Sequence, residues 1–254
     1  MTTGALIFAF NNEHVDYEAM ARWSAGNIER HLGIPTRIIT RQDLDPVTGP
    51  TRTFHDLPAQ VTWYNFNRVD AYSLTPWDRT LLLDADYVVA SDQLKTLLEA
   101  DQDFLAHKTA HDITDSEDFS ELDVFGRNCM PMWWATVVMF RRSPQAKMIF
   151  DCMEMVRNNW NHYCALYGIV RSTYRNDFAL SIALGIVNGH TLDHPGIPWS
   201  LATVTHKHKL TQIDTDQYRV EWVDQTQRNR WLAIAGDFHA MGKGQLGAII
   251  DNNS

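Results

Sequence analysis

Residues 79–89 read RTLLLDADYVV, and this stretch decides the expected fold. Three leucines precede Asp84, and two valines follow Asp86, which is typical of a strand buried on both faces, as in a parallel sheet. Such a strand brings its last residues to the carboxyl edge of the sheet, where open α/β folds bind ligands. Two carboxylates there repel each other unless a cation lies between them, so the motif indicates a divalent metal with phosphate oxygens. The alternative is one aspartate that caps the next turn and another that is merely solvated.

Composition narrows the class of protein. The chain has 254 residues, of which 44% are hydrophobic and 21% charged, as in an ordinary globular protein. Its net charge of −9 disfavours broad, nonspecific binding to nucleic acid or to an anionic membrane. The three cysteines form no C-x-x-C pair, so neither a disulfide framework nor a zinc knuckle is indicated. No signal-peptide pattern or membrane-length apolar run is present, and we expect a cytoplasmic protein.

Apolar strands alternate with amphipathic helices along the chain. We expect strands at 5–10, 36–40, 60–65, 79–89, 104–108 and 133–141, and helices at 15–32, 144–167 and 177–186. This alternation is the signature of an α/β architecture with a mostly parallel central sheet flanked by helices. We find no linker or repeat, so we expect one domain over residues 1–254. Residues 111–128 are acidic and poorly periodic, and we expect a mobile surface loop there that is simply solvated, with a lid over the site as the alternative.

The C-terminal segment carries a second group of candidate residues. Residues 242–247 read GKGQLG and match the dinucleotide pattern G-x-G-x-x-G, but too few residues follow for the helix and strand of a Rossmann unit. The glycines still allow close approach of the backbone to a ligand, and Lys243 can neutralise a diphosphate. His239 adds an imidazole near it, although a lone histidine is more often a packed or surface residue.

Taken in order, these motifs resemble a known family. Asn11 and Asn12 follow the first strand, the sequence Leu-Asp-Ala-Asp ends the apolar strand at residues 83–86, and H-x-x-G-K occupies residues 239–243. This order is similar to that of GT-A glycosyltransferases, in particular glycosyltransferase family 8, the glycogenin and bacterial galactosyltransferase type. The resemblance implies a GT-A-like fold with a nucleotide-sugar site at the carboxyl edge of the sheet.

The resemblance also implies roles for individual residues. Asp84, Asp86 and His239 would hold Mn²⁺ or Mg²⁺, which bridges the diphosphate of a nucleotide sugar, most readily a UDP-sugar. Lys243 would contact that diphosphate. Asn11 and Asn12 would hold the nucleoside, and Arg68 and Ala85 would lie against the donor.

A further resemblance concerns the reacting sugar. Residues 175–180 read RNDFAL and are similar to the family's Asp-Gln-Asp segment, whose last aspartate faces the sugar, so Asp177 is the candidate catalytic residue. Asn176 departs from this pattern. Trp134 and Thr136 stand where the family has asparagine and glycine, which changes the contacts to the sugar there. Family 8 enzymes retain the anomeric configuration, and the resemblance extends this to the chain.

Two other functions fit parts of the sequence. Residues 84–88 also match the D-x-D-x-[TV] motif of haloacid-dehalogenase-type phosphatases, in which Asp84 would be the nucleophile and Asp86 the acid–base. That motif normally lies on the first strand, whereas several elements precede it here, and Asp237 is the one candidate for the late acidic motif. A non-catalytic metal- or nucleotide-binding module is the third interpretation.

The resemblance to glycosyltransferases implies an acceptor with a hydroxyl group. Residues 8–17 and the compact length resemble small glycosyltransferases of tailed bacteriophages, some of which modify hydroxymethylated pyrimidines in phage DNA inside the host cytoplasm. A DNA acceptor would need a basic path to the site, because phosphate contacts demand concentrated positive charge. The candidates for such a path are Arg141, Arg142, Arg171, Arg175, His206, Lys207, His208, Lys209, Arg228 and Arg230. The net charge favours scattered solvated charges instead, so we expect a saccharide or small-molecule acceptor ahead of DNA.

Overall fold

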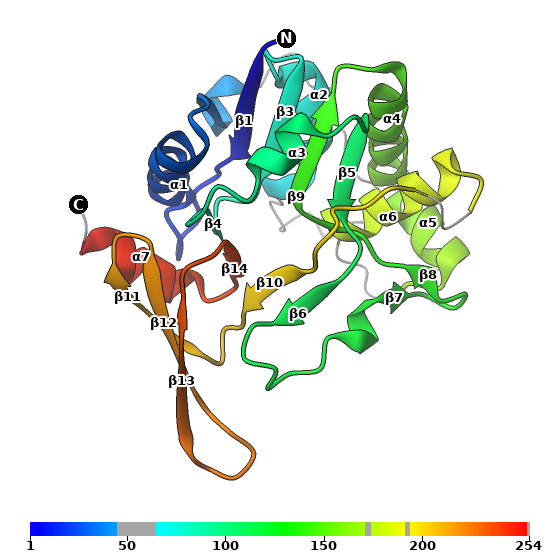
Figure 1. Cartoon of the computed structure of the whole chain (residues 1–254). Helices are drawn as coiled ribbons and strands as arrows, with labels where there is room; N and C mark the ends of the chain where they lie inside the picture. Colours follow the sequence, from blue (N-terminus) through cyan, green and yellow to red (C-terminus); the bar gives the residue numbers. More distant parts are fainter. Residues whose placement is uncertain (45–63, 171–173, 191–193, 253–254) are drawn as a thin grey trace.

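The central feature of the molecule is a mixed five-stranded sheet (Figure 1). The computed structural model describes residues 1–44, 64–170, 174–190 and 194–252. In sheet order the strands are β2 (Thr36–Ile39), β1 (Thr3–Phe8), β3 (Arg79–Leu83), β9 (Trp134–Arg141) and β5 (Phe104–His107). β1 pairs in parallel with β2 and β3, whereas β9 runs antiparallel to β3 and β5. The predicted α/β class with a central sheet flanked by helices is confirmed. Within this mostly parallel sheet, β9 is the strand that runs antiparallel to its neighbours.

Helices cover both faces of this sheet because its strands are apolar on both sides. Leu81 and Leu83 of β3 pack into the core with α1 (Tyr17–Leu32) and α7 (Lys243–Asp251). Leu82 points to the opposite face, into the core with α4 (Pro144–Asn158) and one side of α6 (Asn176–Val187). All five residues of β3 are buried, as the leucine run predicts.

A second sheet lies beside the first. It brings C-terminal strands of the chain to the carboxyl edge of the five-stranded sheet. Its order is β4 (Tyr87–Val88), β14 (Phe238–Ala240), β10 (Leu201–Val204) and β6 (Ala110–Asp112). The single strand expected over 79–89 is therefore wrong, because the chain leaves the first sheet after Leu83 and enters the second at Tyr87. The Tyr87 N–H donates to the Asp84 carbonyl (3.1 Å), which closes a turn between the two strands. The two aspartates lie in this turn.

The remaining strands build surface ribbons. β11 (Lys209–Asp214), β12 (Gln217–Val223) and β13 (Asn229–Ile234) form an antiparallel sheet whose β12–β13 hairpin extends away from the body (Figure 1). β7 (Val124–Phe125) pairs with β8 (Met130–Pro131). The short helices are α2 (Ala71–Leu74), α3 (Lys95–Glu99) and α5 (Trp160–Tyr167), with 3-10 turns at Arg41–Asp43, Tyr64–Asp70 and Ser120–Leu122.

Three further expected elements differ from the structure. The helix expected over 144–167 is two helices, because the chain turns at Asn159 between α4 and α5. The segment 111–128 is not a solvated loop throughout, since it contains most of β6, a 3-10 turn and β7, and Asp112 is buried and accepts hydrogen bonds from Thr114 and Ser116. Residues 60–63 of the strand expected at 60–65 lie outside the described residues, and a 3-10 turn begins at Tyr64.

Within the described part of the chain, no helix has both the length and the apolar character that crossing a membrane requires.

Candidate metal and diphosphate site

Ends of strands from both sheets meet at one cavity of about 400 Å³. The turn after β3 supplies Asp84, Ala85 and Asp86, β14 supplies His239, and α7 begins with Lys243. β14 lies beside β4, with His239 directly opposite Tyr87. This pairing places the late histidine next to the early aspartates. The ligand atoms of Asp84, Asp86 and His239 all lie within 4.8 Å of one another.

Asp86 is the buried centre of this cluster. Lys243 Nζ lies 2.6 Å from its Oδ2, and His239 Nε2 lies 3.5 Å from the same oxygen. Burial opposes ionisation of this carboxyl, but the charges and hydrogen bonds of His239 and Lys243 outweigh burial and hold its pKa well below the usual range. Asp86 is therefore an ionised carboxylate between the Lys243 ammonium and the His239 imidazole.

Asp84 is the open member of the pair. Its side chain is 34% exposed and ion-paired with the guanidinium of Arg68, which is itself buried. Arg68 also donates to the backbone carbonyls of Ala135 and Thr136 on β9, so it joins the Asp84 turn to that strand. One carboxylate oxygen of Asp84 thus holds Arg68 while the side chain remains accessible from the cavity.

The charges of the cluster are balanced within the protein. The two carboxylates of Asp84 and Asp86 face the cations of Arg68 and Lys243. A cation entering alone would have to compete with these two side chains for the carboxylate oxygens. A diphosphate entering with the cation would offer both side chains a new anionic partner, because phosphate oxygens accept strong charge-assisted hydrogen bonds. The arrangement therefore favours joint entry of a cation and a diphosphate.

The donor set fits a divalent cation. Two carboxylates offer the hard oxygen ligands that such ions prefer, and a histidine nitrogen is a common ligand of transition metals. The Nδ1 atom of His239 is buried and has no hydrogen-bond partner among the described residues. The Nε2 atom, which faces Asp86, is the nitrogen that this cluster offers to a cation.

Asp177 lines the same cavity from α6. It lies in the first turn of α6, and its Oδ1 accepts a hydrogen bond from the Ala135 N–H of β9 (2.9 Å). Arg175 lies 2.9 Å from Oδ2 and pairs with it. Asp177 does not cap α6, because the cap residue is Arg175 and no side chain caps the helix. The Asp177 carboxylate instead links α6 to β9 beside the acidic turn.

Asn11 and Asn12 lie before α1 and do not line this cavity. The Oδ1 of Asn11 accepts from the Glu18 N–H (2.8 Å), and that of Asn12 accepts from the N–H groups of His14 and Val15 (2.9 Å each). Both side chains therefore fix the turn that leads into α1. Their contact with a nucleoside remains a prediction.

Several aromatic residues that line the cavity do not stand out in the sequence. They are Phe8, Tyr17, Trp134 and Tyr174. Tyr17 follows the carboxyl end of β1, and the same sheet-edge argument that selects Asp84 would have found it. Burial raises the pKa of its hydroxyl. Trp134 was noticed only as a departure from the family pattern, because a tryptophan in an apolar strand normally indicates core.

Asp237, the candidate for the late acidic residue of a haloacid-dehalogenase-type phosphatase, makes hydrogen bonds away from the cavity. The Oδ1 of Asp237 accepts hydrogen bonds from the Ala90 N–H, the Ser91 N–H and the Ser91 hydroxyl (2.8–2.9 Å). Asp237 thus fixes the chain after β4 and does not line the cavity that contains Asp84. The haloacid-dehalogenase interpretation loses its late acidic residue.

The basic residues considered for a DNA path are mostly paired with acceptors of this chain. Among those of them that the structure describes, only Arg175 lines the cavity. Ion pairs join Arg141 to Asp101, Lys207 to Glu117, Lys209 to Glu221 and Arg230 to Asp224. Arg142 donates to backbone carbonyls, and His208 is buried against Asp112. Arg171 lies outside the described residues.

Comparisons with known proteins give weak structural likenesses. No family model matches the chain, and no curated protein matches it. The galactosyltransferase LgtC, solved with donor and acceptor sugar analogues, is 15% identical at a TM-score of 0.45 and covers 71% of this chain and 70% of its own. The glycosyltransferase GlyE of Streptococcus pneumoniae is 14% identical at a TM-score of 0.42, covering 78% of this chain and 45% of its own. Mouse xyloside xylosyltransferase 1 is 12% identical at a TM-score of 0.44, covering 75% and 83%. These values are too low to assign the chain to a family.

Proposed function

We propose that this chain is a metal-dependent glycosyltransferase that moves a sugar from a nucleotide-sugar donor to a hydroxyl acceptor. One observation carries the proposal: Asp84, Asp86 and His239 lie within mutual reach, in a cavity that also holds Lys243 and Asp177. A carboxylate–histidine cluster beside a lysine suits a metal-bound diphosphate, and a further carboxylate from α6 in the same cavity suits the reacting sugar.

Asp84, Asp86 and His239 would hold the cation. The imidazole nitrogen in the donor set favours Mn²⁺ over Mg²⁺, because Mg²⁺ prefers oxygen ligands in octahedral geometry. When bound, the metal supplies positive charge at the diphosphate oxygens, where negative charge develops as the glycosidic bond breaks. Lys243 would leave Asp86 and donate to the same diphosphate, and Arg68 would lie against the donor from the Asp84 side.

Asp177 would act at the other end of the donor. Positive charge develops on the anomeric carbon during transfer, and a fixed carboxylate stabilises it or orients the acceptor hydroxyl. The Ala135 N–H and Arg175 hold both oxygens of Asp177, so the carboxylate is already oriented before substrate enters. We extend the proposal to transfer with retention of configuration, within a single domain spanning residues 1–254.

A saccharide or a small hydroxyl compound is the acceptor we propose first. Hydroxymethylated DNA is the second candidate, from the phage resemblance alone, since the basic residues that would guide DNA are engaged in local contacts. DNA transfer would require binding that weakens steeply with added salt.

A screen of nucleotide sugars for slow hydrolysis tests the proposal. We expect hydrolysis of at least one nucleotide sugar in the presence of Mn²⁺, its loss on adding a chelator, and its loss in Asp86→Asn. Asp151→Asn, on the exposed face of α4, is the matched control and should behave as wild type. Hydrolysis of a simple phosphomonoester with no nucleotide-sugar turnover, or turnover that survives both the chelator and Asp86→Asn, would overturn the proposal.

A further inference from the structure

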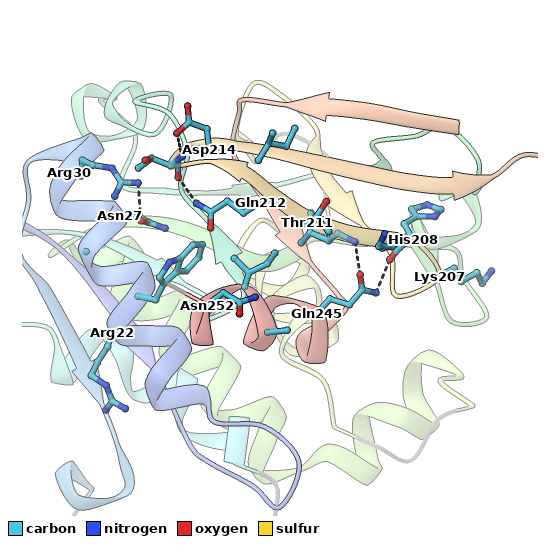
Figure 2. Close-up of a pocket in the computed structure, with 18 residues that line it drawn as sticks. Arg22, Asn27, Arg30, Lys207, His208, Thr211, Gln212, Asp214, Gln245 and Asn252 are labelled. Carbon is cyan, nitrogen blue, oxygen red and sulfur yellow. Dashed lines mark hydrogen bonds between the residues drawn. The ribbon is translucent and has the colours of Figure 1, made fainter. Parts of the chain in front are cut away.

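A second and larger cavity lies between α1, β11 and α7, with a volume of about 1100 Å³ (Figure 2). None of the residues that line it lines the metal and diphosphate cavity. Ligand cavities in proteins commonly measure about 300–1,000 Å³, so this cleft is large enough for several linked rings. The proposed glycosyl transfer assigns no role to it.

The arginine and lysine side chains that line the cleft are already paired with carboxylates of this chain. Arg22 pairs with Glu18 (3.6 Å), Arg30 with Asp216, Lys207 with Glu117 (2.8 Å) and Lys209 with Glu221 (2.9 Å). Asp214 adds a negative charge to the lining beside these paired carboxylates, and like charges repel an anion such as phosphate or sulfate. The cleft therefore suits a neutral ligand.

Asn27 carries an unpaired, buried hydrogen-bond donor in the wall of the cleft. Its side chain is buried, with 4% of the residue exposed, and its Oδ1 accepts a hydrogen bond from Arg30 (3.0 Å). Its Nδ2 has no partner among the described residues. A buried donor without an acceptor is costly, so an acceptor oxygen of a bound ligand would satisfy it. Figure 2 shows Asn27 on α1 facing the cleft beside Arg30.

The rest of the lining combines apolar surface with neutral polar groups. Trp23 contributes a half-buried indole, Leu210 and Ile249 contribute aliphatic surface, and Thr211 contributes a hydroxyl. A Cβ added at Gly26 would meet nothing within 4 Å, so the α1 wall is open at this point. Sugar rings offer C–H faces that pack on aromatic surface and hydroxyl oxygens that accept from amide donors.

We propose that this cleft binds a neutral oligosaccharide, with the Asn27 Nδ2 donating to a sugar oxygen and Trp23 packing against a ring. The proposal goes beyond the glycosyl transfer and does not depend on it. A second saccharide site on the far side of α7 would let the protein hold a glycan chain away from the metal cluster.

Gly26→Trp tests this proposal because it fills the cleft from a position where the structure has room. Calorimetry of the full chain with maltotriose, cellotriose, xylotriose and chitotriose as probes should detect binding of at least one. We expect Gly26→Trp to weaken that binding by about tenfold or more, while Gly26→Ala, the matched control, binds as wild type. Asn27→Ala should weaken it as well.

Two further measurements make the outcome decisive. Saccharide binding should be unchanged in Asp86→Asn, which separates this cleft from the metal and diphosphate cavity. Inorganic phosphate and adenosine are the competing probes. Absence of binding for all four saccharides, saccharide binding that Gly26→Trp leaves intact, or a cleft that takes phosphate or adenosine instead would overturn the proposal.

Discussion

At the residue scale, a substitution of Asp177 can show whether this carboxylate assists the reaction or binds the donor. Asp177→Asn keeps an acceptor oxygen for the Ala135 N–H but removes the negative charge near the anomeric carbon. We expect kcat for nucleotide-sugar hydrolysis to fall by about 100-fold or more, with the donor KM nearly unchanged. Steady-state kinetics measures both constants. A raised donor KM with wild-type kcat would show that Asp177 binds the donor and does not assist the reaction.

His107 gives a pH-dependent prediction at the same scale. It is fully buried at the end of β5 and packs edge-on against Trp199, and burial lowers its pKa to about 3. In the unfolded chain the His107 imidazole takes up a proton as the pH falls below about 6.5. In the folded protein it does so only at a much lower pH. The contribution of His107 to the free energy of unfolding is therefore fully present above about pH 6.5 and is lost as the pH drops from about 6.5 towards 3.

The expected loss from His107 is about 2 kcal/mol in the free energy of unfolding between pH 7.5 and pH 5. Urea denaturation at the two pH values measures it, and His107→Phe should reduce the pH-dependent loss by about this amount. His194, whose pKa burial lowers to about 4, keeps part of the dependence in the variant. An equal pH-dependent loss in wild type and His107→Phe would contradict the account.

At the element scale, the space around two glycines predicts opposite effects of an alanine substitution on stability. A Cβ at Gly4 of β1 would overlap the ring of Trp77, whereas a Cβ at Gly26 of α1 would meet open space. We expect Gly4→Ala to lower the free energy of unfolding by about 1–3 kcal/mol through overpacking. Gly26→Ala should raise it by up to about 1 kcal/mol through helix propensity. Urea denaturation compares them, and a neutral Gly4→Ala would show that Trp77 moves freely.

The same scale shows what the sequence could predict. The run from Leu81 to Leu83 identified the central strand because leucines on both faces require cover from both sides. The sequence could not show that Val88 belongs to another sheet, since the pairing of β4 with β14 joins distant segments. The break at Asn159 was missed because both helices share one apolar period. The strands between residues 209 and 234 were not predicted, although Tyr218, Val220 and Trp222 alternate at the spacing of a strand.

At the scale of the whole molecule, the site could be assembled from motif order but not from any motif alone. Asp84 and His239 come from opposite halves of the chain, and they meet because β14 pairs antiparallel with β4, directly after the turn that holds the aspartates. The placement of Lys243 against Asp86 and of Arg68 against Asp84 depends on side-chain packing, which a motif does not encode. Asn11 and Asn12 followed the motif order equally well, yet their side-chain oxygens are used in the turn before α1.

The balanced charge of the cluster leads to the central claim, which is that a divalent cation and a nucleoside diphosphate bind together at Asp84, Asp86 and His239. Calorimetric titration of UDP into the protein, with and without Mn²⁺, tests it most directly. The account predicts tight UDP binding only with Mn²⁺, a loss of about tenfold or more in Asp86→Asn, and wild-type binding in Asp151→Asn. Equal UDP affinity in wild type and Asp86→Asn, or UDP binding that does not depend on Mn²⁺, would contradict it.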